Sequence, residues 1–244
     1  MITRRQFCGT VATTAVIGSA IQSAQADDKD PKTPQPDSIP AKFQVKIETS
    51  KGDIVIEVTR AWSPNGAARF YDAVKAGFYE DCRFFRVIPG FMVQWGINGD
   101  PKVQSKWRDA EFKDDVVPAK ERASNTRGYI TFAKSGNPNS RTTQLFINFA
   151  DNARLDKDGF TPFGKVIEGM DVVDKLNAKY EGTPSDQQPR IQREGNAFLD
   201  KAFPGLDSIK KARFVGASSA ATDEAKPTQD TPLDDSKSKD GEKS

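Results

Sequence analysis

The sequence contains no histidine, and only two cysteines, Cys8 and Cys82, occur among its 244 residues. The absence of histidine excludes Ser-His-Asp and Cys-His catalysis, zinc helices with two histidines and acid–base catalysis by imidazole. Two cysteines are too few for a four-cysteine zinc site. We therefore expect no metal and no cofactor, and chemistry that uses arginine, carboxylates, hydroxyl groups or binding alone.

Long apolar runs are also missing. Apart from a weak candidate within residues 1–26, no run reaches the ~18 apolar residues that a transmembrane helix requires. The chain is 36% hydrophobic and 29% charged, which is ordinary for a soluble globular protein, and its length suffices for one domain or two small ones. We therefore predict no integral membrane segment in the mature protein.

Residues 1–26 resemble a twin-arginine export signal. Arg4 and Arg5 precede a mildly apolar stretch, residues 8–21, and residues 24–26 (Ala-Gln-Ala) have the small-x-small pattern of a cleavage site. The alternative is a chance Arg-Arg pair before a buried helix. The pattern predicts a twin-arginine-type signal peptide and a protein that is exported to the periplasm or another extracytoplasmic compartment.

The charges of the mature chain would balance. The chain carries 36 basic and 34 acidic side chains, and loss of residues 1–26 removes two basic side chains and no acidic one, so the formal net charge becomes zero. This balance argues against a nucleic-acid or anionic-membrane partner. The mature chain keeps only Cys82, which excludes an internal disulfide and predicts a buried thiol.

The rest of the chain divides into three parts by composition. Residues 27–42 contain four prolines and a run of charges, which is typical of a stiff, solvated linker. Residues 43–216 carry the apolar periodicity of a folded domain. Residues 217–244 are rich in Ser, Thr, Lys and Asp, have almost no large apolar side chain, and are predicted to be a disordered polar tail.

Apolar periodicity predicts the elements of the domain. Alternating residues from Phe43 to Val58 predict a hairpin with Lys51-Gly52 at its turn. Ser63 and Pro64 begin a helix that Gly77 ends. Further strands are expected at residues 129–133, 144–149, 163–167 and 209–215, further helices at residues 170–179 and 197–203, and loops at residues 95–128 and 181–193.

Arg86 is the unusual residue of the domain. It lies in residues 84–94, a strand-like run whose other side chains are apolar, glycine, proline or amide. Such a strand buries most of its side chains, and a buried arginine is rare unless it is paired or used. The alternative is an arginine at a sheet edge that extends its charge into water. A second block, residues 133–149, runs from a Gly/Asn loop into a strand.

Together the two blocks resemble the cyclophilin-type peptidyl-prolyl isomerases. The similarity spans about residues 43–176 and includes Leu155-Asp156 and residues 163–166 in family order, with one extra residue near Asn137. The resemblance implies a mainly β fold: a closed eight-stranded antiparallel β-barrel capped by two α-helices, with a peptide groove on its outer face. It also implies proline-containing polypeptides as partners.

The resemblance assigns site residues one by one. Arg86 falls on the catalytic arginine, and Gln94 would orient it or hold a substrate carbonyl. The proline pocket and its rim fall on Phe91, Met92, Phe146, Leu155 and Phe160. Gln144 would be a second polar support, and the backbone around Ala133 and Lys134 would pair with the substrate chain. Taken singly, the apolar residues among these are more often core residues than pocket walls.

Four positions depart from the family pattern. Phe85 and Phe160 stand where many members have histidine. Lys134 stands where asparagine is common, although that contact uses the backbone. Arg154 stands where many members have a tryptophan that contacts cyclosporin, which leaves sensitivity to the drug open.

Prolyl isomerisation suits these residue types. Rotating an X–Pro bond costs ~18–20 kcal/mol because amide resonance must be broken, and it needs no proton transfer. In the twisted transition state the prolyl nitrogen regains its lone pair and accepts a hydrogen bond, so a guanidinium aimed at it stabilises that state alone. A rate gain on the order of 10⁵ requires about 7 kcal/mol.

We therefore predict a single-domain, monomeric peptidyl-prolyl cis-trans isomerase that acts on exported proteins as they fold. One alternative is a non-catalytic binder or chaperone that holds proline-containing segments in the same groove. The other is a barrel that carries a small ligand inside, which requires small or polar interior side chains, whereas the predicted strands carry Phe, Ile and Val.

Overall fold

The predicted hairpin opens the sheet. The computed structural model describes residues 33–216, so the predicted signal peptide, the first part of the predicted linker and the predicted tail lie outside the described residues. Strands β1 (Lys42–Thr49) and β2 (Gly52–Thr59) pair antiparallel along their whole length. The hairpin prediction is confirmed.

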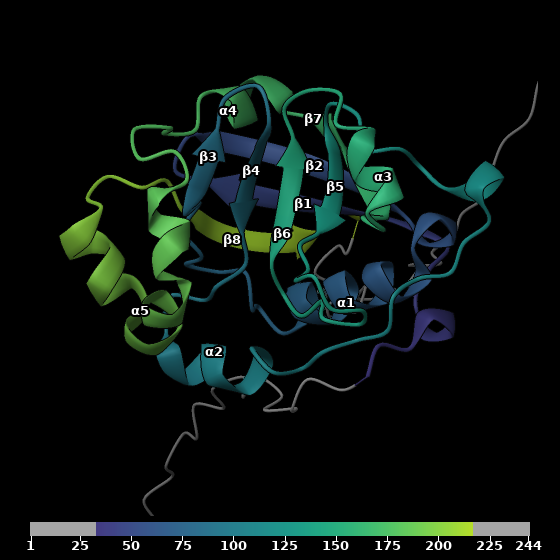
Figure 1. Cartoon of the computed structure of the whole chain (residues 1–244), viewed down its shortest axis with the longest axis horizontal. Coiled ribbons are helices and arrows are strands. Elements are labelled where there is room, and N and C mark those ends of the chain that lie inside the picture. The colour runs from purple at the N-terminus through teal and green to yellow at the C-terminus, as the bar shows by residue number, and fades with distance from the viewer. Residues whose placement is uncertain (1–32, 217–244) are drawn as a thin grey trace, which may run out of the picture.

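Eight strands form one antiparallel sheet (Figure 1). The strands after the hairpin are β3 (Arg86–Ile88), β4 (Met92–Trp95), β5 (Tyr129–Phe132), β6 (Leu145–Asn148), β7 (Pro162–Glu168) and β8 (Ile209–Phe214). Their order across the sheet is β3-β4-β6-β5-β7-β2-β1-β8. The strands predicted at residues 129–133, 144–149, 163–167 and 209–215 correspond to β5, β6, β7 and β8, and they are confirmed to within one residue at each end.

The sheet is curled but open, and the prediction of a closed barrel is wrong in this respect. The edge strands β3 and β8 do not pair, and an isolated bridge between Arg83 and Ser208 joins the segments that precede them. The backbone N–H of Val87 instead donates to the carbonyl oxygen of Glu181 over 3.1 Å. The chain around Glu181 therefore covers the edge of β3 that β8 would need for closure.

The strand-like run at residues 84–94 is two strands, not one. A turn at Pro89-Gly90 separates β3 from β4, and the N–H of Phe91 closes it on the carbonyl of Ile88 at 3.0 Å. Gly90 has a φ of +73°, a left-handed conformation that glycine adopts without steric cost. The Pro-Gly pair is a turn signal that outweighs the continuous apolar pattern.

Apolar side chains fill the inside of the curled sheet. Apolar residues of β1, β2, β5, β6 and β7 that are at most 1% exposed form its centre: Val45, Ile47, Ile54, Ile56, Val58, Ile130, Phe132, Leu145, Ile147 and Phe163. A carrier of a small ligand would need room inside, so this packing contradicts the second alternative reading of the sequence.

Helix α1 (Pro64–Lys75) begins at the predicted Ser63-Pro64 pair, but Ser63 does not cap it. The carboxylate of Asp115, from a distant loop, accepts hydrogen bonds from the backbone N–H groups of Asn65 at 2.7 Å and Gly66 at 3.2 Å. The Ser63 hydroxyl donates to the same carboxylate. The helix packs its buried face against β7 and β8.

Helices also occur where loops were predicted. Residues 95–128 contain α2 (Pro101–Trp107), which the Asp100 side chain caps at the N–H of Lys102, and the 3-10 helix η3 (Ala119–Glu121). The helix predicted at residues 170–179 is shorter than expected, since α4 covers Met170–Asp174. The predicted capping of a barrel by two helices is not confirmed, because the sheet is open; α1 packs on β7 and β8, and α4 packs on β2.

The largest departure from the predicted elements follows α4. The predicted loop 181–193 contains the 3-10 helix η4 (Thr183–Gln187) and the first part of α5 (Gln188–Ala202), which runs on through the predicted helix at 197–203. Helix α5 is kinked at Gly195, whose φ is +61° and ψ −146°. Its apolar side chains form a second, smaller core with Phe85 and Ile97: Ile191, Phe198 and Leu199.

The described part of the predicted linker is packed onto the domain. It contains the 3-10 helix η1 (Pro36–Ser38), and both Pro34 and Ile39 are buried. Arg60, in the 3-10 helix η2 (Arg60–Trp62), donates to the carbonyl oxygens of Pro36 and Ile39, each over 2.9 Å. Within residues 33–216, every helix is too short or too polar to cross a bilayer.

Candidate functional site

Strand register places three side chains in one row. Arg86 in β3 is the cross-strand partner of Gln94 in β4, and Gln94 is the partner of Phe146 in β6. Side chains alternate between the two faces of a sheet. Val93 and Ile147, the sequence neighbours of Gln94 and Phe146, therefore point into the core, where they are fully buried. The row lies on the outer face.

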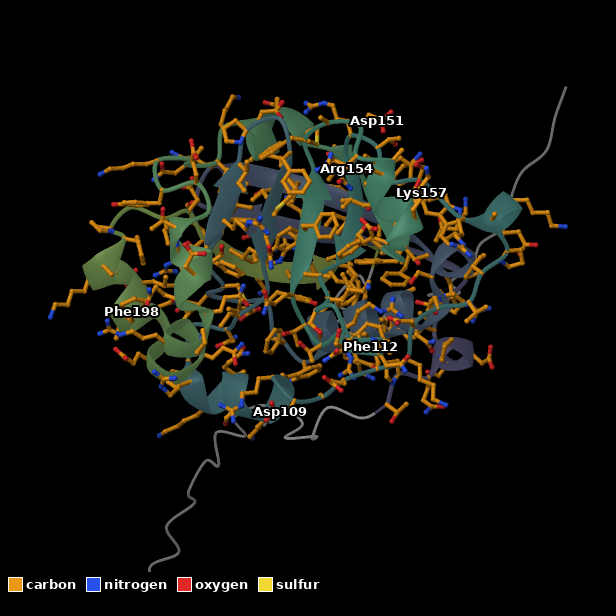
Figure 2. The ribbon with its side chains drawn as sticks, in the orientation of Figure 1. Asp109, Phe112, Asp151, Arg154, Lys157 and Phe198 are labelled. Carbon is orange, nitrogen blue, oxygen red and sulfur yellow. The ribbon has the colours of Figure 1, made fainter. Side chains whose placement is uncertain are left out.

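A groove of about 410 Å³ lies over this row. It is lined by every site residue expected from the sequence: Arg86, Phe91, Met92, Gln94, Ala133, Lys134, Gln144, Phe146, Leu155 and Phe160. Figure 1 shows β3, β4 and β6 between α5 on one side and α3 (Arg154–Lys157) on the other. Figure 2 shows the same arrangement through Phe198 on α5 and Arg154 on α3. The structure gathers the predicted residues at one place, and their roles remain predictions.

Arg86 is half-buried at the polar end of the groove. Its Nη1 donates to Oε1 of Gln94 over 3.2 Å, and its guanidinium carbon lies 6.0 Å from the centre of the Phe91 ring. Burial lowers the pKa of Arg86, and the charge of Asp186 in η4 partly opposes this effect. The side chain makes no ion pair within salt-bridge distance among the described residues, so a substrate can approach the charge.

The other end of the groove is apolar. Met92 and Phe146 are 2% and 4% exposed, so they form a dry floor, and Leu155 stands on the side of α3. Phe160 packs edge-on against Phe146, with ring centres 5.8 Å apart and planes at 73°. A compact, uncharged ring such as that of proline fits this kind of surface.

The polar end continues through three glutamines. Nε2 of Gln94 donates to Oε1 of Gln144 over 2.8 Å, and Nε2 of Gln144 donates to Oε1 of Gln188 over 2.9 Å. Gln188 lines the groove from the start of α5, and it was not predicted as a site residue because residues 181–193 were predicted as loop. Three hydroxyl side chains that also line the groove were missed as well: Ser135, Ser140 and Thr142.

Buried asparagines hold the loops that carry the apolar wall. Nδ2 of Asn152 donates to the carbonyl oxygen of Phe91 over 2.8 Å. Nδ2 of Asn125 donates to the carboxylate of Asp156 over 2.7 Å and to the carbonyl oxygen of Phe160 over 2.8 Å. These bonds fix Phe91 and Phe160 relative to the strands. No sequence motif marked the two asparagines, because their partners are distant backbone groups.

Of the four residues that depart from the family pattern, Lys134 and Phe160 line the groove, Arg154 lies next to Phe91, and Phe85 lies in the second core. The Arg154 guanidinium lies 4.9 Å from the centre of the Phe91 ring, and the Lys134 ammonium lies 5.3 Å from that of Phe160. Phe85 is 1% exposed and packs in the second core against α5. The apolar side chain at position 85 is therefore explained by its packing with α5. Among residues 33–216, no three acidic, cysteine or histidine side chains are grouped as metal ligands would be.

Comparison with protein families gives one match over most of the domain. Residues 44–195 match the model of the cyclophilin type peptidyl-prolyl cis-trans isomerase/CLD family. A peptidyl-prolyl cis-trans isomerase of Acinetobacter baylyi is 41% identical over 140 residues, which cover 56% of this chain and 72% of that protein. Peptidyl-prolyl cis-trans isomerase B of Escherichia coli is 36% identical over 145 residues, 57% of this chain and 86% of the relative.

Solved structures share the fold at lower sequence identity. A cyclophilin type peptidyl-prolyl cis-trans isomerase of Cryptosporidium parvum superposes with a TM-score of 0.53 at 22% identity, over 72% of this chain and 99% of that one. The cyclophilin AquaCyp293 of Hirschia baltica superposes with a TM-score of 0.51 at 20% identity, over 78% of each chain.

Proposed function

Because the chain belongs to the cyclophilin-type peptidyl-prolyl cis-trans isomerase family, we propose that it accelerates rotation about X–Pro bonds in exported proteins, with Arg86 as the catalytic group. The observation that carries the proposal is the position of Arg86. Its charge lies at the polar end of a groove whose other end is a dry, apolar surface. Proline-containing polypeptides are the proposed substrates.

The apolar end would bind the proline ring. Phe91, Met92, Phe146 and Leu155 would hold the ring still while the carbonyl of the preceding residue swings. The backbone N–H of Ala133 already donates to the carbonyl of Gln144 at 2.9 Å. The Ala133 carbonyl and the Lys134 backbone would therefore pair with the substrate chain. Fixing one side of the rotating bond lowers the entropic part of the barrier.

Arg86 would stabilise the transition state. As the amide twists, the prolyl nitrogen becomes a hydrogen-bond acceptor, and the guanidinium has donors to offer it. This interaction is absent in the planar ground state, so it lowers the barrier and not merely the energy of the bound peptide. Gln94 would hold the guanidinium in position through its 3.2 Å contact. No proton moves, which suits a site without histidine.

A proline-peptide isomerisation assay on the mature protein tests the activity. We expect acceleration over the uncatalysed rate on the order of 10⁵ at saturation, as the required ~7 kcal/mol is within reach of one charged donor with desolvation and positioning. A protein that binds the peptide at the groove yet leaves its exchange rate unchanged would be the non-catalytic binder, and the proposal would fail.

We also propose that the protein works as a monomer outside the cytoplasm. The support for export is residues 1–26, where Arg4 and Arg5 precede an apolar stretch. Replacing both arginines with lysine should keep the full chain in the cytoplasm when cell fractions are compared. Export of that variant at the normal level would contradict the twin-arginine route.

A further inference from the structure

The glutamine chain that starts at Arg86 has one fixed direction. A guanidinium carries only donors, so Gln94 must turn its oxygen toward Arg86 and its amide nitrogen away. Gln94 therefore donates to Gln144 at 2.8 Å, and Gln144 donates in turn to Gln188 at 2.9 Å. Each amide accepts on the side of Arg86 and donates on the side of α5. The chain is complete only if its far end is an acceptor, which is Oε1 of Gln188.

The element that supplies this acceptor is fixed to the strand that carries Arg86. Phe85, next to Arg86 in sequence, lies in the second core together with Ile191 of α5. At the kink of α5, the N–H of Asn196 donates to the carbonyl of Gly99 at 3.0 Å, and its Nδ2 donates to the carboxylate of Asp81 at 2.8 Å.

Backbone packing at the kink leaves α5 little freedom to shift. A Cβ at Gly195 would lie 2.1 Å from the carbonyl oxygen of Gly99, so the two backbones touch directly. On the other side of β3, the carbonyl of Glu181 accepts from the N–H of Val87. The polypeptide is thus bonded to β3 at Glu181, before η4, and to Gly99 and Asp81 at the kink of α5, with Gln188 between these two contacts in sequence.

We propose that Gln188 is a positioning residue for prolyl isomerisation: it holds the amides of Gln144 and Gln94 in the orientation that keeps Arg86 aimed at the prolyl nitrogen. The proposal rests on the isomerase function proposed above. It assigns α5 a part in the site that is distinct from stabilising the fold. Gln188 acts through two other side chains, so its loss affects the transition state more than peptide affinity.

Three variants test whether the donor-to-acceptor direction of the glutamine hydrogen bonds matters, or only that the bonds form. Gln188→Glu keeps an acceptor at the end of the chain. Gln188→Lys offers only donors, so Gln144 must turn its oxygen toward α5, Gln94 must follow, and Arg86 then faces an amide nitrogen. Gln192→Lys places the same charge one helical turn further along α5, at a half-buried position that does not line the groove.

The test measures kcat and KM for a proline peptide by NMR exchange, together with the side-chain amide resonances of Gln94 and Gln144 without peptide. We expect Gln188→Lys to lower kcat by about tenfold, with KM within about twofold, as removal of an interaction specific to the transition state does. Gln188→Glu should stay within about threefold of the unmodified protein, and Gln192→Lys within about twofold. The resonances of both glutamines should shift in Gln188→Lys.

Several outcomes would overturn the proposal. A rise in KM with unchanged kcat would make Gln188 a peptide contact instead. An equal loss of kcat in Gln188→Glu and Gln188→Lys would show that hydrogen-bond direction is irrelevant. Unchanged Gln94 resonances in Gln188→Lys would show that a change at residue 188 does not reach Gln94. Thermal unfolding of each variant identifies a loss due to misfolding. If the unmodified protein lacks activity, the isomerase function fails, while the resonance shifts still test the chain.

Discussion

Arg86 carries its charge in a half-buried position, and this has a consequence for pH dependence. Burial lowers its pKa, and the charge of Asp186 partly opposes the lowering. The groove contains no histidine, since the chain has none. Arginine stays protonated in proteins at any physiological pH. The proposed catalytic group should therefore keep one protonation state throughout the working range.

We expect kcat/KM for a proline peptide to change by less than about twofold between about pH 6 and 9, since no group with an ordinary pKa in that range acts in the mechanism. Initial rates in buffers of constant ionic strength check this. A sigmoidal loss of activity with its midpoint inside the range would contradict the account, because a second ionising group would then control the rate.

The site residues differ in how far the sequence predicts them. Arg86, Gln94 and Phe146 fall on one face because strand alternation fixes the face of every second residue, and the family pattern fixes the strands. Gln188 was missed because its role depends on how α5 docks, and docking is a property of distant contacts such as Gly195 on Gly99. Local patterns do not contain that information.

At the scale of elements, the N-terminus of α1 depends on one buried carboxylate. Asp115 caps two backbone N–H groups and lies 3.0 Å from Nη1 of Arg141, and the two side chains are 2% and 3% exposed. Removing this carboxylate leaves two backbone N–H groups without their acceptor and takes from Arg141 one of its two carboxylate partners, the other being Asp114 at 3.1 Å.

We predict that Asp115→Ala lowers the free energy of unfolding by about 3 kcal/mol or more. Urea unfolding followed by circular dichroism measures the change. The control is Asp171→Ala, which removes the exposed pair with Lys175 and should leave the midpoint unchanged. An Asp115 variant as stable as the parent protein would show that α1 does not need this cap.

The second prediction at this scale concerns the stability contributed by the kink of α5. Gly195→Ala puts a methyl group against the Gly99 carbonyl and forces alanine into a left-handed conformation, so we expect a loss of about 2–4 kcal/mol in unfolding free energy. Gly205→Ala is the matched control, because Gly205 also has a positive φ but its Cβ would meet nothing closer than 3.8 Å. That variant should lose only about 1 kcal/mol. Equal losses would show that close packing at the kink is unimportant.

Elements with a regular apolar pattern were predicted well, and those held by tertiary contacts were not. Strand β1 alternates between buried and more exposed residues, and β5 and β6 are short runs of mostly apolar residues, so their positions followed from the sequence. Helix α2 and the first half of α5 are polar on most of their surface and were predicted as loops. Their ends are set by Asp100 and by the Gly195 kink. The hairpin at Pro89-Gly90 carried a turn signal that the apolar run obscured.

At the scale of the whole molecule, the filled interior and the outer groove are separate. The inside of the curled sheet is packed with side chains at most 1% exposed, whereas the groove residues lie on the opposite face of β3, β4 and β6. A change in the groove can therefore alter activity without unfolding the protein. That the sheet stays open could not be predicted from the strands, because the segment at Glu181, which bonds to β3, lies in a predicted loop.

The most direct test of the account compares Arg86→Ala with the unmodified mature protein on one proline peptide, with exchange rate and Kd measured in the same NMR samples. We expect kcat/KM to fall by about 10²-fold or more, as for loss of one preorganised donor to a transition state. Kd should change by less than about threefold, and the thermal midpoint should be retained. An Arg86→Ala protein that isomerises the peptide at the unmodified rate would contradict the central claim.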